Sequence, residues 1–146
     1  MSYASSYTKL MIWDESYETG NMAVDNAHMK LFSLIKDVMD ANFSGSKEKI
    51  ESAIDFLADY ALLHFADEEK LMDESEFPGA SEHKSQHEAF AKGVMAMKEK
   101  INKDYDNLQI STEINRTVAY WLVNHILYSD KLLAKHYKWW QKNYGR

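Results

Sequence analysis

Apolar residues recur every three or four positions along most of the chain, a spacing that predicts amphipathic α-helices. Four long segments show it, and short polar connections between them predict antiparallel neighbours. The expected fold is therefore all-α, an up-down-up-down four-helix bundle. The residues on the predicted inner faces are, helix by helix, Val24, His28, Leu31, Ile35 and Val38; Ile50, Ile54, Leu57, Ala61, His64, Glu68 and Leu71; His83, His87, Phe90, Val94, Met97 and Ile101; and Ile114, Val118, Leu122 and His125.

Turn-forming residues set the expected helix boundaries. The second helix should span about residues 47–74, because Pro78 and Gly79 follow it. Ser81 and Ser111 are predicted to cap the third and fourth helices.

The two ends of the chain lack the long helical stripe of the middle. Residues 1–20 should form an N-terminal arm anchored by Ile12 and Trp13. A shorter amphipathic segment, about residues 132–146, should form a C-terminal helix after the bundle of about 21–131. We expect one domain in all.

Composition narrows the possible functions. The net charge of −6 gives no basic surface for a phosphate backbone, so nucleic acid is not an expected partner. The chain has no cysteine, so any metal must bind through His, Asp or Glu. Neither a secretion signal nor a membrane span is visible, and we therefore expect a cytoplasmic protein without a membrane partner.

Helical geometry separates the polar residues of "LLHFADEEKLM". At about 100° per residue, Glu68 lies roughly 40° from His64, on the buried side of the second helix. Glu69 lies roughly 140° from His64 and should face water. Asp67 falls at the edge of the buried stripe. His64 and Glu68 are therefore the predicted inward pair.

The same test directs His28, His83, His87 and His125 inward from the other three helices. Asp130 follows His125 by five residues, about 140° round a regular helix, so it converges with His125 only where the helix bends or ends. A single inward histidine is usually a hydrogen-bonded core residue. Five imidazoles and a carboxylate buried together would compete for few partners, at a cost of a few kcal/mol each, and this predicts a metal site.

The spacing of these residues differs from two familiar metal motifs. A zinc protease needs H-E-x-x-H, whereas "HKSQH" has Lys84 in place of the glutamate. Ferritin-like di-iron bundles use E-x-x-H pairs, whereas nitrogen ligands dominate here. Five histidines and two carboxylates suit two ions: if Glu68 and Asp130 each bridge both ions with a solvent oxygen, one ion is six-coordinate and the other has an open position. Imidazole with carboxylate suits iron, and ligand type alone leaves zinc and manganese open.

Five stretches, "WDES", "VDNAHMKLF", "HFADEEKLM", "HKSQHEAF" and "WLVNHILYSD", together resemble the hemerythrin family, particularly the bacterial hemerythrins, across nearly the whole chain. The resemblance implies two non-haem iron ions that bind dioxygen reversibly. It also implies the ligand roles: one iron held by His83, His87 and His125, the open iron held by His28 and His64, and bridges from Glu68 and Asp130.

The resemblance further places Leu122, with its neighbour Trp121, in an oxygen pocket. One departure concerns the first ligand: Ala27 and Met29 flank His28 where the family commonly has Gln and Lys, which changes the surroundings of that imidazole.

The expected function is oxygen storage, transport or delivery by a monomer that is not an enzyme, with an oxygen-requiring enzyme as a possible recipient. Two alternatives use the same open iron: a peroxidase, oxidase or nitric-oxide-handling enzyme, and a di-iron oxygen or redox sensor. No inward acid or base beyond the ligands is identifiable for proton transfer, which disfavours the enzyme.

Overall fold

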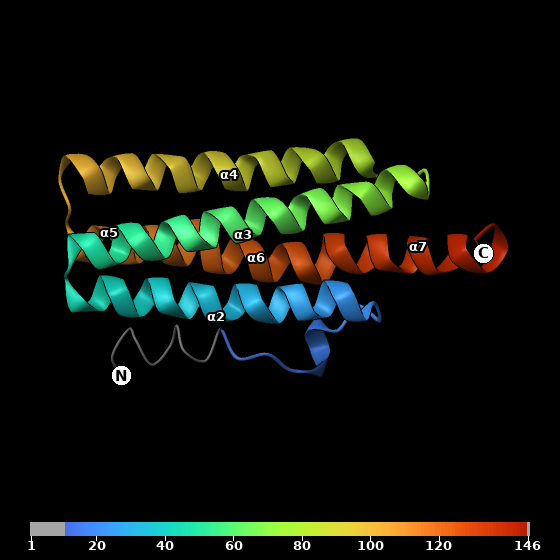
Figure 1. The fold of residues 1–146 in the computed structure, drawn as a ribbon, viewed down its shortest axis with the longest axis horizontal. Coiled ribbons are helices and arrows are strands. Elements are labelled where there is room, and N and C mark those ends of the chain that lie inside the picture. Colours follow the sequence, from blue (N-terminus) through green and yellow to red (C-terminus); the bar gives the residue numbers. More distant parts are fainter. Residues whose placement is uncertain (1–10, 146) are drawn as a thin grey trace.

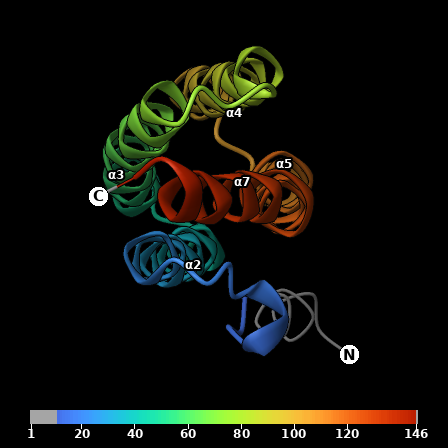
Figure 2. The same ribbon diagram turned by 90° about the vertical axis from the view of Figure 1, so that its right-hand side faces the viewer.

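The computed structural model describes residues 11–145, and these fold into four long helical rods that lie side by side (Figure 1). The first three rods are α2 (Met22–Ser44), α3 (Lys47–Glu74) and α4 (Ala80–Lys103). The fourth is built from five consecutive helical pieces, named below. Viewed along its length, the bundle has the rods grouped around a common core (Figure 2). The all-α bundle predicted from the periodicity is confirmed.

The first connection shows why neighbouring rods are antiparallel. Gly45 ends α2 with φ +74°, a left-handed conformation that glycine adopts without strain. Ser46 follows at once and caps α3, its side chain accepting a hydrogen bond from the Lys49 backbone N–H. Because only these two residues join the helices, the chain must reverse direction.

The starts of the last two rods differ from the prediction. Helix α4 begins at Ala80 after Gly79, with no side-chain cap, so Ser81 lies inside its first turn. The fourth rod begins earlier than Ser111, because Asp106 caps it by accepting from the Leu108 and Gln109 backbone N–H groups. Both predicted caps are wrong because each helix starts before its inner stripe becomes visible in the sequence.

The fourth rod runs through α5 (Asn107–Glu113), η2 (Ile114–Ala119), α6 (Tyr120–Asn124), η3 (His125–Asp130) and α7 (Lys131–Asn143). The stretches η2 and η3 are π-helical, with wider turns than an α-helix. The C-terminal helix α7 continues the fourth rod without a break, so the expected boundary near residue 131 falls within one continuous rod.

The buried core residues agree closely with the predicted inner faces, except near the end of α3, where the buried residue is one position later than predicted. Met72, one turn after Glu68, is fully buried, whereas Leu71 is only half-buried. Met72 packs with Phe77 and Leu133 in a small separate cluster at one end of the bundle. The main core consists of the inward residues of all four rods, among them Leu31, Ile35, Ile54, Leu57, Val94, Met97, Ile101, Val118 and Leu122.

The described part of the N-terminal arm packs along α2, and it includes the short 3-10 turn η1 (Glu15–Tyr17). Trp13, one of the two predicted anchors, packs edge-on against Phe32, with ring centroids 5.4 Å apart. Ile12 is 50% exposed, and the buried residue is its neighbour Met11. Ile12 is therefore not the anchor; residues 1–10 of the expected arm lie outside the described part.

None of the helices in residues 11–145 combines the length and apolar composition needed to cross a membrane.

Candidate metal centre

The structure brings together all seven residues that the sequence predicts as ligands, and each is at most 4% exposed. Their metal-binding atoms form two groups that share Glu68 and Asp130. We call these the three-histidine position (His83, His87, His125) and the two-histidine position (His28, His64). His136, the remaining histidine, lies outside both groups, with its Nε2 at 2.9 Å from the Ser75 carbonyl oxygen.

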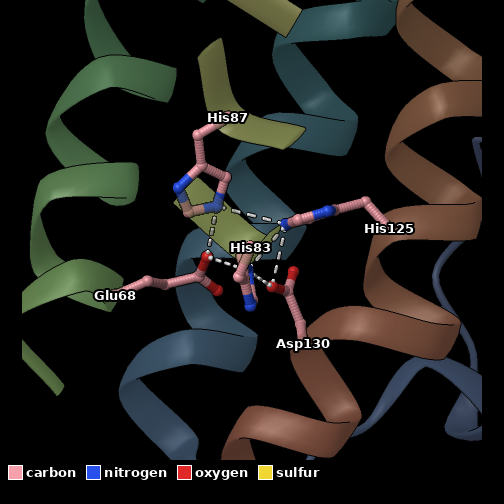
Figure 3. Close-up of side chains that lie close together, drawn as sticks. All are labelled: Glu68, His83, His87, His125 and Asp130. Atoms are coloured by element: carbon pink, nitrogen blue, oxygen red, sulfur yellow. Dashed lines mark hydrogen bonds and ion pairs between the residues drawn. The ribbon is translucent and has the colours of Figure 1, made fainter. Parts of the chain in front are cut away.

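In the three-histidine position, side chains from three rods point at one another (Figure 3). His83 Nε2 lies 3.0 Å from His125 Nε2, and His87 Nε2 lies 3.2 Å from the same atom. One oxygen of each carboxylate completes the group. Glu68 Oε1 is 3.1 Å from His87 Nε2, and Asp130 Oδ1 is 3.0 Å from His83 Nε2.

In the two-histidine position, the other oxygen of each carboxylate is used. His28 Nε2 lies 2.9 Å from Asp130 Oδ2, and His64 Nε2 lies 3.2 Å from Glu68 Oε2. Each carboxylate therefore turns one oxygen toward each histidine group. This is the arrangement by which a carboxylate bridges two cations.

The π-helical stretch η3 explains how Asp130 joins His125. In an α-helix, residues five apart lie about 140° from each other around the axis. A π-helix pairs residues five apart in its hydrogen bonds, so its wider turn sets Asp130 nearly above His125. As a result, His125 Nε2 lies 3.1 Å from Asp130 Oδ1. The predicted condition, that Asp130 converges only where the helix departs from regularity, is met by this wider turn.

Two polar side chains, Glu69 and Gln86, hold a proton on the Nδ1 atoms of His87 and His125, the ring nitrogens that point away from the other ligands. Glu69 Oε2 lies 3.0 Å from His87 Nδ1, and Gln86 Oε1 lies 2.7 Å from His125 Nδ1. An ionised carboxylate and an amide oxygen can only accept, so each Nδ1 must donate. In the neutral imidazoles, which are the forms that bind a metal, the Nε2 atoms of His87 and His125 then carry lone pairs directed into the group. The prediction that Glu69 simply faces water is wrong: its carboxylate reaches sideways to His87, although the side chain stays 34% exposed.

The buried atoms of the centre fit a pair of metal ions better than they fit one another. The lone pairs on His87 Nε2 and His125 Nε2 face each other at 3.2 Å, which only a proton or a cation can stabilise. His28 Nε2, His64 Nε2, Glu68 Oε2 and both Asp130 oxygens make no well-aligned hydrogen bond within the described residues, despite their close contacts. Ligand atoms at right angles around one ion, each about 2.1 Å from it, would be about 3 Å apart. The distances between neighbouring ligand atoms in this centre, such as 3.0 Å from His83 Nε2 to His125 Nε2, match that separation.

The charges of the metal-free centre support the same interpretation. Burial alone lowers the pKa of His28, but contact with Asp130 and Glu68 outweighs it and raises the pKa to about 9. The pKa of His83 is raised to about 9 by the same balance. Burial raises the pKa of Asp130, yet the surrounding imidazoles bring it down to about 2. Protons thus occupy the place of a cation when no metal is bound.

Aromatic rings wall the centre on the side of the three-histidine position. The Phe65 ring stacks on His87 with centroids 3.9 Å apart, and Trp121 stacks on His125 at 4.4 Å. Leu122 is 2% exposed within the main core. Sequence reasoning missed Phe65, Glu69 and Gln86 as neighbours of the ligands. Each is adjacent in sequence to a predicted ligand, and adjacency was the one signal available.

A four-helix bundle with a buried site for two ions, built from histidines and shared carboxylates, defines a dinuclear metal-binding protein. Comparison with known families agrees: the Hemerythrin HHE cation binding domain matches residues 19–137. The chain belongs to the hemerythrin family.

Individual relatives cover most of the chain. It is 30% identical over 129 residues to the bacteriohemerythrin of Stenotrophomonas maltophilia (strain R551-3), covering 88% of this chain and 82% of the relative. It is 32% identical over 118 residues to a hemerythrin-like protein of Naegleria gruberi, covering 81% and 86%. A crystal structure of wild-type hemerythrin shares the fold, with a TM-score of 0.76 at 24% identity over 86% of this chain and 96% of that one.

Proposed function

We propose that the protein binds dioxygen reversibly at two non-haem iron ions and so stores, carries or delivers oxygen. The observation that carries the proposal is the unequal division of the ligand atoms around two shared carboxylates. The three-histidine position offers five protein ligands, and the two-histidine position offers four. The position with fewer ligands keeps more room for an exogenous molecule.

In this proposal, His83, His87 and His125 would hold one iron, His28 and His64 would hold the other, and Glu68 and Asp130 would be ligands to both. The paired irons supply the electrons for reversible oxygen binding when they are present. The bundle holds the imidazoles in place through Glu69 and Gln86 and excludes water with Phe65, Trp121 and Leu122. We assign Trp121 and Leu122 to the wall of the oxygen pocket.

Binding is favoured over catalysis by the other buried polar groups. Within residues 11–145, the fully buried polar side chains besides the seven are Asn42 and Ser75. Asn42 donates to Ser111 and the Asn107 carbonyl, and Ser75 donates to the Leu71 carbonyl. Both therefore serve helix ends. Glu69, the acidic side chain that contacts the ligand His87, accepts at Nδ1, on the side of the imidazole away from the other ligands. Proton-transfer chemistry usually needs an acid or base that reaches the bound molecule, so the arrangement supports an oxygen-binding protein that is not an enzyme.

The test is to reduce the protein without air, measure its iron content, and then admit oxygen while recording the visible spectrum. Two irons per chain and an absorption band that disappears when oxygen is removed are expected. Immediate conversion to a stable ferric form would instead favour the sensor or an oxidative enzyme. Zinc at full occupancy in protein purified from its native cells would contradict an iron-based function.

We also propose that the protein acts as a cytoplasmic, single-domain monomer that passes oxygen to an oxygen-requiring enzyme. The absence of cysteine from the sequence fits a reducing compartment. Cell fractionation and the mass of the purified protein in solution test these points. Recovery in a membrane or periplasmic fraction would contradict the location, and a stable dimer would contradict the monomer.

A further inference from the structure

The two metal positions differ in the hydrogen-bond partners of their histidine Nδ1 atoms, the ring nitrogens opposite the metal-binding Nε2 atoms. In the three-histidine position, the Nδ1 atoms of His87 and His125 each have a side-chain acceptor, Glu69 and Gln86. His83 Nδ1 is buried and has no hydrogen-bond partner within residues 11–145. In the two-histidine position, His28 Nδ1 is likewise buried and unpartnered there. In the three-histidine position, two of the three imidazoles thus have a side-chain hydrogen-bond acceptor at Nδ1.

The two acceptors are themselves held in place. Ser129 donates to Gln86 Oε1 at 2.6 Å, so the amide oxygen that accepts from His125 is fixed by a second bond. Glu69 lies next to the bridging Glu68 on α3 and reaches His87 across the gap to α4. Both imidazoles are also stacked on aromatic rings, His87 on Phe65 and His125 on Trp121. Neither ring can rotate without losing a hydrogen bond and a stacking contact.

An acceptor behind a ligating histidine has two effects on a metal ion. It fixes the tautomer that leaves the Nε2 lone pair free, and it makes that nitrogen a stronger donor. A carboxylate such as Glu69 does this more strongly than a neutral group, because its hydrogen bond is charge-assisted. Removal of such a partner typically costs on the order of 10–100-fold in metal affinity.

We propose that Glu69 and Gln86 are positioning residues that make the three-histidine position the tighter of the two, so that it retains its ion after the two-histidine position has lost one. The inference rests on the ligand assignment of the proposed function. It adds an order of metal release, and it identifies two non-ligand side chains that contribute to this order beside the additional histidine ligand of the three-histidine position.

The test follows release of zinc from the full-length, zinc-loaded protein to a chromophoric chelator in excess. The wild type should release two equivalents in two phases, one fast and one slow. Glu69→Leu removes the acceptor and keeps water from replacing it, so the slow phase should accelerate by about 10- to 100-fold while the fast phase is unchanged. Gln86→Leu should act in the same direction.

Two variants separate the hydrogen bond from a general effect on folding. Glu69→Gln keeps an oxygen acceptor for His87 and should restore release to within a few-fold of the wild-type rate. Asp67→Leu introduces the same side chain two residues earlier on α3, at an exposed position, and should leave both phases unchanged. Equal acceleration by Asp67→Leu and Glu69→Leu, or no acceleration by Glu69→Leu and Gln86→Leu, would overturn the proposal.

The phases are assigned with His64→Ala, which removes a ligand from the two-histidine position only. This variant should lose the fast phase and keep the slow one; loss of the slow phase instead would overturn the order of release. The amount of zinc that the wild type binds distinguishes failure of the positioning proposal from failure of the ligand assignment. Two equivalents bound, with positioning variants that change nothing, would reject this inference alone, whereas no zinc bound by the wild type would also reject the ligand assignment.

Discussion

At the scale of residues, the two carboxylates link the two histidine groups into one centre, because each carboxylate contacts histidines of both groups. Glu68 directs Oε1 toward His87 and Oε2 toward His64, and Asp130 divides its oxygens in the same way. Because both carboxylates are buried, their negative charges need the cations or protons that the centre holds.

Glu68→Gln should cost the protein at least one of its two irons. The amide NH2 group that replaces one oxygen cannot bind a metal, so one of the two positions loses a ligand. Iron content per chain, measured after anaerobic loading and desalting, checks this. The neighbouring Glu69→Gln keeps its acceptor oxygen and should remain close to two irons; retention of both irons by Glu68→Gln would contradict the bridging role.

Leu122→Asn should speed autoxidation of the oxygenated protein. An amide in place of a buried leucine brings a polar group, and with it water, toward the irons. The decay rate of the oxygenated visible spectrum in air gives the measurement. Leu132→Asn, at a position that is 58% exposed on α7, is the matched control. Equal decay rates in Leu122→Asn and the wild type would remove Leu122 from the oxygen pocket.

At the scale of elements, helical period places six of the seven proposed ligands, because five face the core from regular α-helices and His125, the first residue of η3, directly follows the regular helix α6. Asp130 is the weakest candidate by geometry, because a regular helix would place it about 140° from His125. The π-helical turn that directs it inward depends on tertiary packing and leaves no periodic signal in "HILYSD". Glu69 was assigned to water for a related reason: helical phase gives the direction of Cα–Cβ, and a long side chain can reach sideways across to the next helix.

Helix starts were the least predictable part of the fold. Gly79 begins α4 without a side-chain cap, and Asp106 begins the fourth rod before any apolar stripe is visible. Asp106→Ala should therefore lower the free energy of unfolding by about 1 kcal/mol, since the Leu108 and Gln109 N–H groups lose their acceptor. Ser81→Ala, at the cap expected from sequence, should change it by less than about 0.5 kcal/mol. Denaturant unfolding of the metal-free variants distinguishes the two; a larger loss in Ser81→Ala would contradict the observed helix start.

At the scale of the whole molecule, the metal centre joins all four rods, so its state of charge affects the stability of the entire fold. His28 and His83 have pKa values raised from 6.5 to about 9 in the metal-free protein. Folding therefore favours their protonated forms. The stability that these protons contribute is fully present below pH 6.5 and is lost as the pH rises through about 9.

The metal-free protein should accordingly melt at progressively lower temperature as the pH is raised from 6.5 to 9.5. Bound metal replaces these protons, so the zinc-loaded protein should not show this loss, and metal uptake should release protons to the solution. Thermal melts of both forms over the same pH series check the prediction. A metal-free protein that becomes more stable between pH 6.5 and 9.5 would contradict the raised pKa values.

The proposed function requires that the protein binds dioxygen and releases it chemically unchanged. The most direct measurement is oxygen uptake and release by the reduced, iron-loaded protein in repeated cycles of exposure and degassing. About one O2 should be taken up per pair of irons, and the same amount should be recovered on degassing, over several cycles. Uptake of oxygen that is not recovered, with the irons left ferric after the first exposure, would contradict it.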